Sequence, residues 1–326
     1  MSVRKFMALA VLSSSLFLAP YSSIAADYVL KLAHNADTSE PGHVSSLEFA
    51  RLMKEATNGK VEVQVFPNGQ LGSERELMEG ILLGNVDIIK PAIPVVGNFV
   101  PEVNVLNLPF LFHDEAHLER VLAGPFSEKL YEIMAAKGIR LLGMHTTGVR
   151  HIMSKKPIFG IEDIKGLKIR TLESPAQVFA FNTYGANATP IAYTELYGAL
   201  QTGVVDGAEA ANTNYHAKKF YEVAPYWALI GWMTLANPLI MSEKKFRSLP
   251  TDVQSALLEI GKKSGAHNRA LYTQSDNEKL SELLAVGVKV TMVNPGPFRE
   301  ASKKVYERFL KSDGDRELLR LIEATK

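Results

Sequence analysis

The N-terminal part of the chain shows two hydrophobic patterns in turn. Residues 27–33 and 60–66 alternate apolar and polar side chains, which is typical of half-buried strands. Between them, residues 43–57 place apolar side chains at helical spacing, and Asn58 and Gly59 end that segment. A strand, a helix and a strand in this order predict a parallel βαβ unit at the start of the fold.

An internal similarity suggests two lobes of related plan. Residues 76–87 and 195–206 share five of twelve residues in register, namely Glu, Leu, Gly, Val and Asp. Each segment predicts a short amphipathic helix, a glycine that ends it and the entry to a strand. Such units also recur by chance. The length of 326 residues independently favours two domains.

The longest predicted helix runs from Thr251 to Val286 and carries an apolar stripe. At 1.5 Å per residue it would approach about 50 Å, which is longer than one lobe. Gly261 and Gly265 are points at which this helix can bend. A coiled-coil dimerisation helix is the alternative, and the absence of a strict heptad disfavours it.

The strongest candidate for binding chemistry is Arg170. The alternation of residues 167–170 predicts a short strand that ends there. Ser174 and Pro175 then have the residue types that begin a helix, and Gly185 has the type that ends one. Arg170 therefore lies at the carboxyl end of a strand and near a helix N-terminus. Ligands of open α/β sheets bind at such ends, and a guanidinium there suits a carboxylate held by two parallel hydrogen bonds.

Three successive motifs resemble the central signature of the solute-binding proteins of TRAP transporters, the tripartite ATP-independent periplasmic transporters. They read GVR at 148–150, SKKPI at 154–158 and DIKGLKIR at 163–170. The resemblance implies that Arg170 fixes the carboxylate of the substrate and that Arg150 supports it. It also implies an α/β, two-lobed periplasmic-binding-protein fold with a cleft, crossing strands as a hinge and a long helix that spans both lobes.

On this basis we expect lobe I to comprise residues 26–147 and about 236–275, and lobe II to comprise residues 148–235 and about 276–326. The cleft would close on a small organic acid and deliver it to the membrane subunits of the transporter. Closure excludes water and strengthens charge-assisted hydrogen bonds. We expect no cofactor, no chemistry on the ligand and a monomeric protein.

One departure from the family pattern affects the pocket. The segment ending at Glu209 resembles the family's VDGxE, where the next residue is commonly Asn and reaches into the site. Here Ala210 and Ala211 occupy those places. A replacement polar side chain could come from Asn212, Asn214 or Tyr215.

Other residues favour a sugar acid, such as a uronate or an aldonate, over a C4-dicarboxylate. If Glu74 and Glu173 line the cleft, they would repel a second carboxylate and accept hydrogen bonds from hydroxyls. Both acids also suit purely structural places, at a helix start and in a turn. Further candidates for contacts with the ligand are His34, Asn35, Trp232 and Asn237, although Trp232 suits a core position equally well.

Composition and the N-terminus indicate export. Residues 1–25 combine Arg4 and Lys5 with an apolar run and small residues before a cleavage point near Ala25, which predicts a signal peptide and a periplasmic protein. Without those two basic residues the net charge changes from +1 to −1, because 34 basic residues then face 35 acidic ones. This balance gives no support for a nucleic-acid partner. The chain has no cysteine, which excludes disulfides and thiol chemistry.

The competing class is an exported enzyme. The sequence contains no GxSxG, HExxH, P-loop or GxGxxG motif. His113 and His117 share a helix face at metal-ligand spacing, but no third ligand is evident, so we expect a solvated helix start and no metal site. A binding protein that feeds an ATP-driven importer or a sensor is the third alternative.

Overall fold

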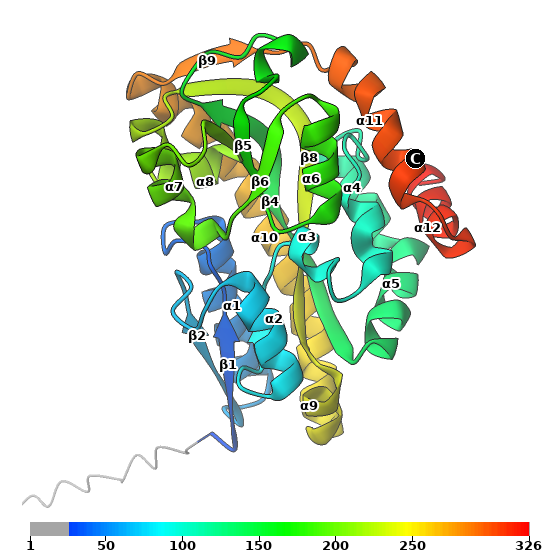
Figure 1. Ribbon diagram of the computed structural model, residues 1–326. Coiled ribbons are helices and arrows are strands. Elements are labelled where there is room, and N and C mark those ends of the chain that lie inside the picture. The colour runs from blue at the N-terminus through cyan, green and yellow to red at the C-terminus, as the bar shows by residue number, and fades with distance from the viewer. Residues whose placement is uncertain (1–25, 326) are drawn as a thin grey trace, which may run out of the picture.

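The predicted βαβ opening is confirmed by strand β1 (Tyr28–Ala33), helix α1 (Pro41–Ala56) and strand β2 (Val61–Phe66), whose strands pair in parallel. The structure is a computed structural model and describes residues 26–325. The predicted signal peptide, residues 1–25, lies outside the described residues. Figure 1 shows a mixed α/β protein with two lobes, one around β1 and β2 and the other around β5 and β6.

Two long antiparallel strands, β4 (Ile139–Ser154) and β8 (Tyr226–Ser242), cross from one lobe to the other. Within the described residues the strands form one sheet in the order β2-β1-β3-β8-β4-β7-β5-β6, and β9 pairs with β8. The Ser242 end of β8 pairs with β3, whereas its Tyr226 end pairs with β9. The remaining strands are β3 (Ile88–Ile89), β5 (Lys168–Thr171), β6 (Asn187–Pro190), β7 (Gly207–Ala210) and β9 (Lys289–Met292).

The predicted strand and helix around Arg170 are also confirmed. Strand β5 contains Arg170, and the side chain of Ser174 caps helix α6 (Pro175–Thr183) by accepting a hydrogen bond from the Gln177 N–H. The remaining helices of the described chain are α2 (Glu74–Leu83), α3 (Ile93–Val96), α4 (Glu115–Ala123), α5 (Pro125–Ala136), α7 (Leu196–Thr202), α8 (Asn212–Ala217), α9 (Glu243–Ser248), α11 (Gly296–Phe309) and α12 (Asp313–Glu323), with 3-10 helices η1 (Pro101–Asn107), η2 (Ile161–Ile164), η3 (Tyr193–Glu195) and η4 (Phe220–Glu222).

The long helix is α10 (Thr251–Ala285), and it runs behind both lobes in Figure 1. Leu257 of α10 packs with Phe49 of α1 in one apolar core, while Leu283 packs with Tyr215 and Trp227 in another. One helix therefore contributes to the cores of both lobes. Among the described residues, no helix combines the length and the apolarity that crossing a bilayer requires.

Glycines allow α10 to lie directly against β4. A Cβ atom at Gly261 would overlap the backbone of Leu142, and one at Gly265 would overlap the carbonyl of Met144. Gly143 on the strand faces Gly261 in the same way. The helix is continuous through these positions. The glycines thus serve close backbone approach, whereas the sequence had suggested points of bending.

We predict that Gly261→Ala lowers the free energy of unfolding by about 1–3 kcal/mol, because the added methyl group overpacks the contact between α10 and β4. Gly198→Ala in α7 is the control, since a Cβ there meets nothing within 4 Å. Alanine favours the helix, so this control should raise stability by up to about 1 kcal/mol. Urea denaturation measures both changes. An unchanged Gly261→Ala protein would show that the close contact is not required.

Candidate functional site

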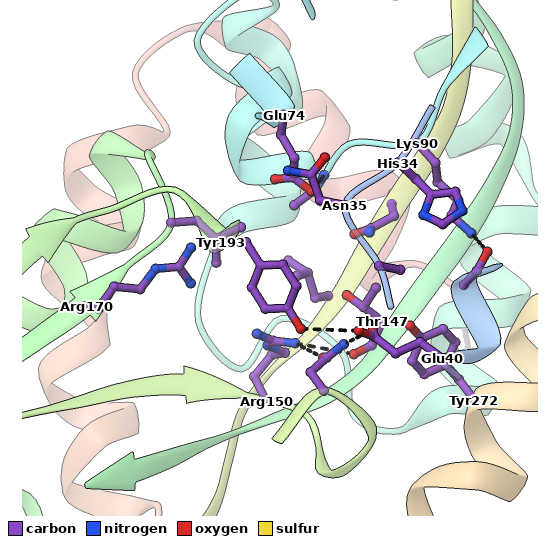
Figure 2. Close-up of a pocket in the computed structure, with 17 residues that line it drawn as sticks. His34, Asn35, Glu40, Glu74, Lys90, Thr147, Arg150, Arg170, Tyr193 and Tyr272 are labelled. Carbon is purple, nitrogen blue, oxygen red and sulfur yellow. Dashed lines mark hydrogen bonds between the residues drawn. The ribbon is translucent and has the colours of Figure 1, made fainter. Parts of the chain in front are cut away.

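A cavity lies where the crossing strands and both lobes meet (Figure 2). His34, Asn35 and Glu74 line it from the β1–β3 lobe, and Arg150 and Arg170 line it from the β5–β7 lobe. A guest in this space would contact both lobes at once.

A buried carboxylate lies between the two arginines. Strand β7 lies between β4 and β5 in the sheet, so Arg150, Glu209 and Arg170 come from three neighbouring strands. The Glu209 carboxylate accepts a hydrogen bond from Arg150 Nε at 2.6 Å, and its other oxygen lies 3.7 Å from Arg170 Nη1. All three side chains are buried. Two positive charges and one negative charge leave a net charge of +1 in this group.

The two guanidinium groups differ in how many of their N–H donors remain available to a ligand. Arg150 donates to Glu209 and, through Nη1, to Asn214 Oδ1 at 2.8 Å. Arg170 donates from Nε to the Ile191 carbonyl at 2.8 Å, and neither of its Nη atoms has a hydrogen-bond partner in the described part of the chain. The fork of Arg170 is therefore free to bind an anion in the cavity.

Burial and neighbouring charges act on both arginines. Burial and the Arg150 charge lower the pKa of Arg170, although Glu209 opposes them. Burial also acts to lower the pKa of Arg150, but the Glu209 carboxylate outweighs it and raises the pKa above its usual value. A bound carboxylate would favour the charged form of Arg170 in the same way as Glu209 favours that of Arg150.

A bulge in β4 lets two residues that a regular strand would point to opposite faces both line the cavity. Thr147 and Arg150 are three positions apart, so a regular strand would point them to opposite faces. The pairing of β4 with β8 shifts register between Thr146 and Val149, and Gly148 there has a φ of 78°. The bulge lets both Thr147 and Arg150 line the cavity.

Glu74 and Asn35 lie across the cavity from Arg150 (Figure 2). Glu74 is in the first turn of α2, and one of its oxygens accepts a hydrogen bond from the Ala92 N–H at 3.2 Å. Burial raises the pKa of this carboxyl to about 7, against the attraction of Arg170. In the orientation that satisfies its amide, Asn35 donates to the Gly72 carbonyl at 3.2 Å and accepts from the Glu74 N–H at 3.3 Å.

Lys90 and His34 occupy the same end of the cavity in Figure 2. Lys90 Nζ donates to the Gly42 carbonyl and lies 3.3 Å from the hydroxyls of Ser45 and Ser46, so the protein itself already uses its donors. Burial lowers the pKa of Lys90 to about 7. Burial, Lys90 and His43 lower the pKa of His34 to about 2, so this imidazole is neutral.

Within residues 26–325, several polar atoms at the cavity have no hydrogen-bond partner. They are buried and belong to residues that line it: Thr147 Oγ1, Asn237 Oδ1, Tyr272 OH and His34 Nδ1. Buried polar groups are normally paired, because an unpaired one costs about 1–3 kcal/mol. A guest with several hydroxyl groups would supply the missing partners.

Comparison with known proteins identifies the family. Residues 32–313 match the profile of bacterial extracellular solute-binding protein family 7, also called DctP. The chain belongs to this family. A family relative, a solute-binding protein of Verminephrobacter eiseniae, is 34% identical over 259 residues, which are 78% of this chain and 77% of the relative.

Solved structures of family members have the same fold. A TRAP periplasmic solute-binding protein of Roseobacter denitrificans with bound β-D-glucuronate superposes with a TM-score of 0.88 at 30% identity, over 91% of this chain and all of that one. A TRAP periplasmic solute-binding protein of Sulfurospirillum deleyianum with bound succinate gives a TM-score of 0.86 at 34% identity, over 92% of this chain and all of that one. Both matches agree with the family suggested by the three motifs.

Six of the ten residues predicted for the site surround the cavity. They are His34, Asn35, Glu74, Arg150, Arg170 and Asn237. Of the three candidates for the polar side chain missing at Ala210 and Ala211, the structure brings Asn214 to the cavity.

The other four residues lie elsewhere. Trp232 is a core residue whose ring contacts that of Phe181 edge-on, with ring centroids 5.1 Å apart, so it does not wall the cavity. Tyr215 stacks on Trp227 in the core of the β5–β7 lobe, with ring centroids 4.3 Å apart. The Asn212 amide accepts from the Trp227 indole N–H at 2.8 Å, so it is also used internally.

Glu173 lies at the rim of the site. Its neighbour Leu172 lines the cavity, whereas Glu173 lines a small hollow beside it together with Glu74 and Arg170. Its carbonyl accepts a hydrogen bond from the Asn98 amide at 2.6 Å, which joins two distant parts of the chain. The expected contact of Glu173 with a guest stays a prediction.

The histidine pair has a structural role here. His117 Nδ1 accepts from the His113 N–H at 3.2 Å, and its Nε2 lies 3.1 Å from the Ile322 carbonyl, which joins α4 to α12. In the described part of the chain, no three His, Asp or Glu side chains gather in a metal-binding group.

Sequence reasoning missed several residues that line the cavity, among them Glu40, Lys90, Thr147, Tyr193 and Tyr272. One of them carried a usable signal. Lys90 follows Ile88 and Ile89 directly, and a lysine at the end of a buried strand must find partners or a ligand. Thr147 reaches the cavity through the bulge in β4, and the others come from loops and helices whose approach to the cavity depends on the complete fold.

We predict that Glu74→Gln stabilises the ligand-free protein at pH 8 and has little effect at pH 4. The folded-state pKa of about 7 exceeds the usual 4.5, so ionisation destabilises the fold increasingly as the pH rises through that interval. The amide removes this penalty above pH 7, which is up to about 3 kcal/mol. Melting temperatures at both pH values test this. Glu79→Gln, an exposed position on the same helix, should show no such pH-dependent difference. Equal effects of Glu74→Gln at the two pH values would contradict the prediction.

Proposed function

We propose that this protein is the extracytoplasmic receptor of a TRAP transporter and that it binds a sugar acid, either a uronate or an aldonate. The observation that carries the proposal is the free guanidinium fork of Arg170, which borders the cavity close to Arg150 and Glu209. A planar carboxylate can accept two parallel hydrogen bonds from such a fork. Arg150 would act as the second donor and hold the site's geometry.

The charge balance supports one carboxylate on the guest. Arg150, Arg170 and Glu209 sum to +1, so one anion completes the group. Glu74 and Lys90 carry opposite charges with pKa values near 7 and leave this balance almost unchanged. Glu40 also lines the cavity; burial raises the pKa of its carboxyl, and Asn214 donates a hydrogen bond to it within the protein. A second carboxylate near Glu74 would meet a like charge or force that acid to stay protonated.

The unpaired polar atoms support a hydroxylated guest. Thr147 and Tyr272 can each donate and accept, Asn237 presents an acceptor, and the outer carboxylate oxygen of Glu74 can accept from a hydroxyl. Leu172 and Leu235 give the cavity an apolar side. This combination suits a sugar ring or chain, which has hydroxyl edges and C–H faces.

A C4-dicarboxylate is the second candidate. It is favoured by the succinate in the Sulfurospirillum structure, whose sequence is 34% identical to this one. The buried Lys90 ammonium also lies at the cavity, although its donors bind Gly42, Ser45 and Ser46. The glucuronate in the Roseobacter structure supports the sugar acid.

Closure of the two lobes around the guest would create the shape that the membrane subunits distinguish from the open form. The relatives are solute-binding proteins, which favours a receptor over an exported enzyme. We expect the receptor to act in the periplasm as a monomer, with no cofactor, no metal and no nucleic-acid partner.

We predict that D-glucuronate, D-galacturonate or D-galactonate raises the melting temperature and binds in calorimetry without turnover. Arg170→Ala should weaken that binding by about 2–5 kcal/mol, because the variant loses the bidentate contact. Arg75→Ala removes an exposed arginine paired with Glu79 and should leave the affinity unchanged. Tight binding of succinate or malate without any binding of these sugar acids would overturn the proposed ligand class.

A further inference from the structure

A chain of hydrogen bonds crosses the cleft beside the cavity (Figure 2). Arg150 Nη1 donates to Asn214 Oδ1 at 2.8 Å, and Asn214 Nδ2 donates to Glu40 Oε2. The other Glu40 oxygen accepts from the Asp37 N–H at 2.9 Å and from the Tyr193 hydroxyl at 3.3 Å. The chain therefore begins on a guanidinium that lines the cavity and ends on a carboxylate.

The two ends of this chain belong to different lobes. Glu40 immediately precedes α1, in the lobe that contains β1 and β2, whereas Asn214 lies on α8, directly after β7. Glu40 is 2% exposed and Asn214 is 4% exposed, so no bulk water reaches the contact. If the lobes separate, Asn214 and Glu40 lose each other and both become accessible to water.

We propose that Glu40 and Asn214 are a positioning pair that couples closure of the lobes to the placement of Arg150. In the closed form, Glu40 holds Asn214, and Asn214 holds the Nη1 end of the Arg150 guanidinium. The pair stabilises the closed complex and contributes nothing to the first encounter with the ligand. The inference goes beyond the proposed ligand class, because it requires only a guest that closes the cleft.

The chain of hydrogen bonds from Arg150 through Asn214 to Glu40 has a fixed direction from donor to acceptor. Asn214 Oδ1 also faces the Ala211 N–H at 3.4 Å, so two donors point at this oxygen and orient the amide. Its Nδ2 must then face an acceptor, which Glu40 supplies. In Glu40→Gln, the new side-chain NH2 group can face the Asn214 NH2 group, so two donors meet. In Asn214→Asp, the new carboxylate faces the Glu40 carboxylate, so two acceptors of like charge meet.

Because of this direction, a double variant should restore the hydrogen bonds that each single variant breaks. Glu40→Gln and Asn214→Asp are nearly isosteric, and each alone breaks the chain. Together they restore it, because the new aspartate accepts from Arg150 and from the amide of the new glutamine, with the net charge unchanged. Glu48→Gln on α1 is the control, since Glu48 pairs with Arg51 at 2.6 Å outside the cavity.

Stopped-flow binding of D-glucuronate separates the association rate from the dissociation rate. We expect each single variant to raise the dissociation rate about tenfold or more with a nearly unchanged association rate, and the double variant to return to within about threefold of wild type. The Glu48→Gln control should match wild type. Melting temperatures of the ligand-free variants check that all are folded.

The proposed positioning pair is wrong if the single variants have unchanged dissociation rates. It is also wrong if the double variant dissociates as fast as the worse single variant. The ligand class fails differently. If the wild-type protein binds succinate and not D-glucuronate, the sugar-acid proposal is wrong. The same four variants, measured with succinate, then test the positioning pair.

Discussion

Two buried guanidinium groups share one buried carboxylate, and the rest of the site depends on this arrangement. Burying charges is costly unless they are paired. One Glu209 oxygen pairs with Arg150, and the other lies 3.7 Å from Arg170. The group is therefore incomplete by one negative charge when the cavity is empty. An anionic guest at Arg170 restores electrical balance at the point where water is excluded, so its charge-assisted hydrogen bonds act in a low dielectric.

The fold supplies rigidity on one side of the cavity and adaptability on the other. Arg150, Glu209 and Arg170 lie on three adjacent strands, whose backbone pairing fixes their separation. The opposite wall comes from the loop after β1 and the first turn of α2, where Asn35 and Glu74 lie. The crossing strands β4 and β8 and the glycine contact with α10 join the two sides. Such a construction places the charged group on one lobe and most of its polar opposite wall on the other.

Local sequence signals predicted the parts of this structure that local physics determines. The alternation before Arg170 and the Ser174–Pro175 pair specified a strand end and a helix start, and both are present. The periodicity of residues 251–286 specified one long helix, which ends one residue earlier than predicted. The motif resemblance then gave the two arginines a role that an isolated arginine would not suggest.

Contacts between distant segments could not be predicted in the same way. Trp232 lies within a register shift of β8, between Ala228 and Met233, and its direction depends on this irregularity, which no single-strand pattern reveals. The choice among Asn212, Asn214 and Tyr215 depends on the turn of α8, where neighbouring residues face the core and the cleft. Glu40 and Tyr272 are far apart in sequence and meet at the cavity once the lobes pack together.

The most direct test of the central claim is a crystal structure of the protein with bound D-glucuronate. We expect the ligand carboxylate within hydrogen-bonding distance of both Nη atoms of Arg170, with Glu209 still between the two arginines. A ligand held elsewhere, with the Arg170 fork turned away from it, would contradict the account.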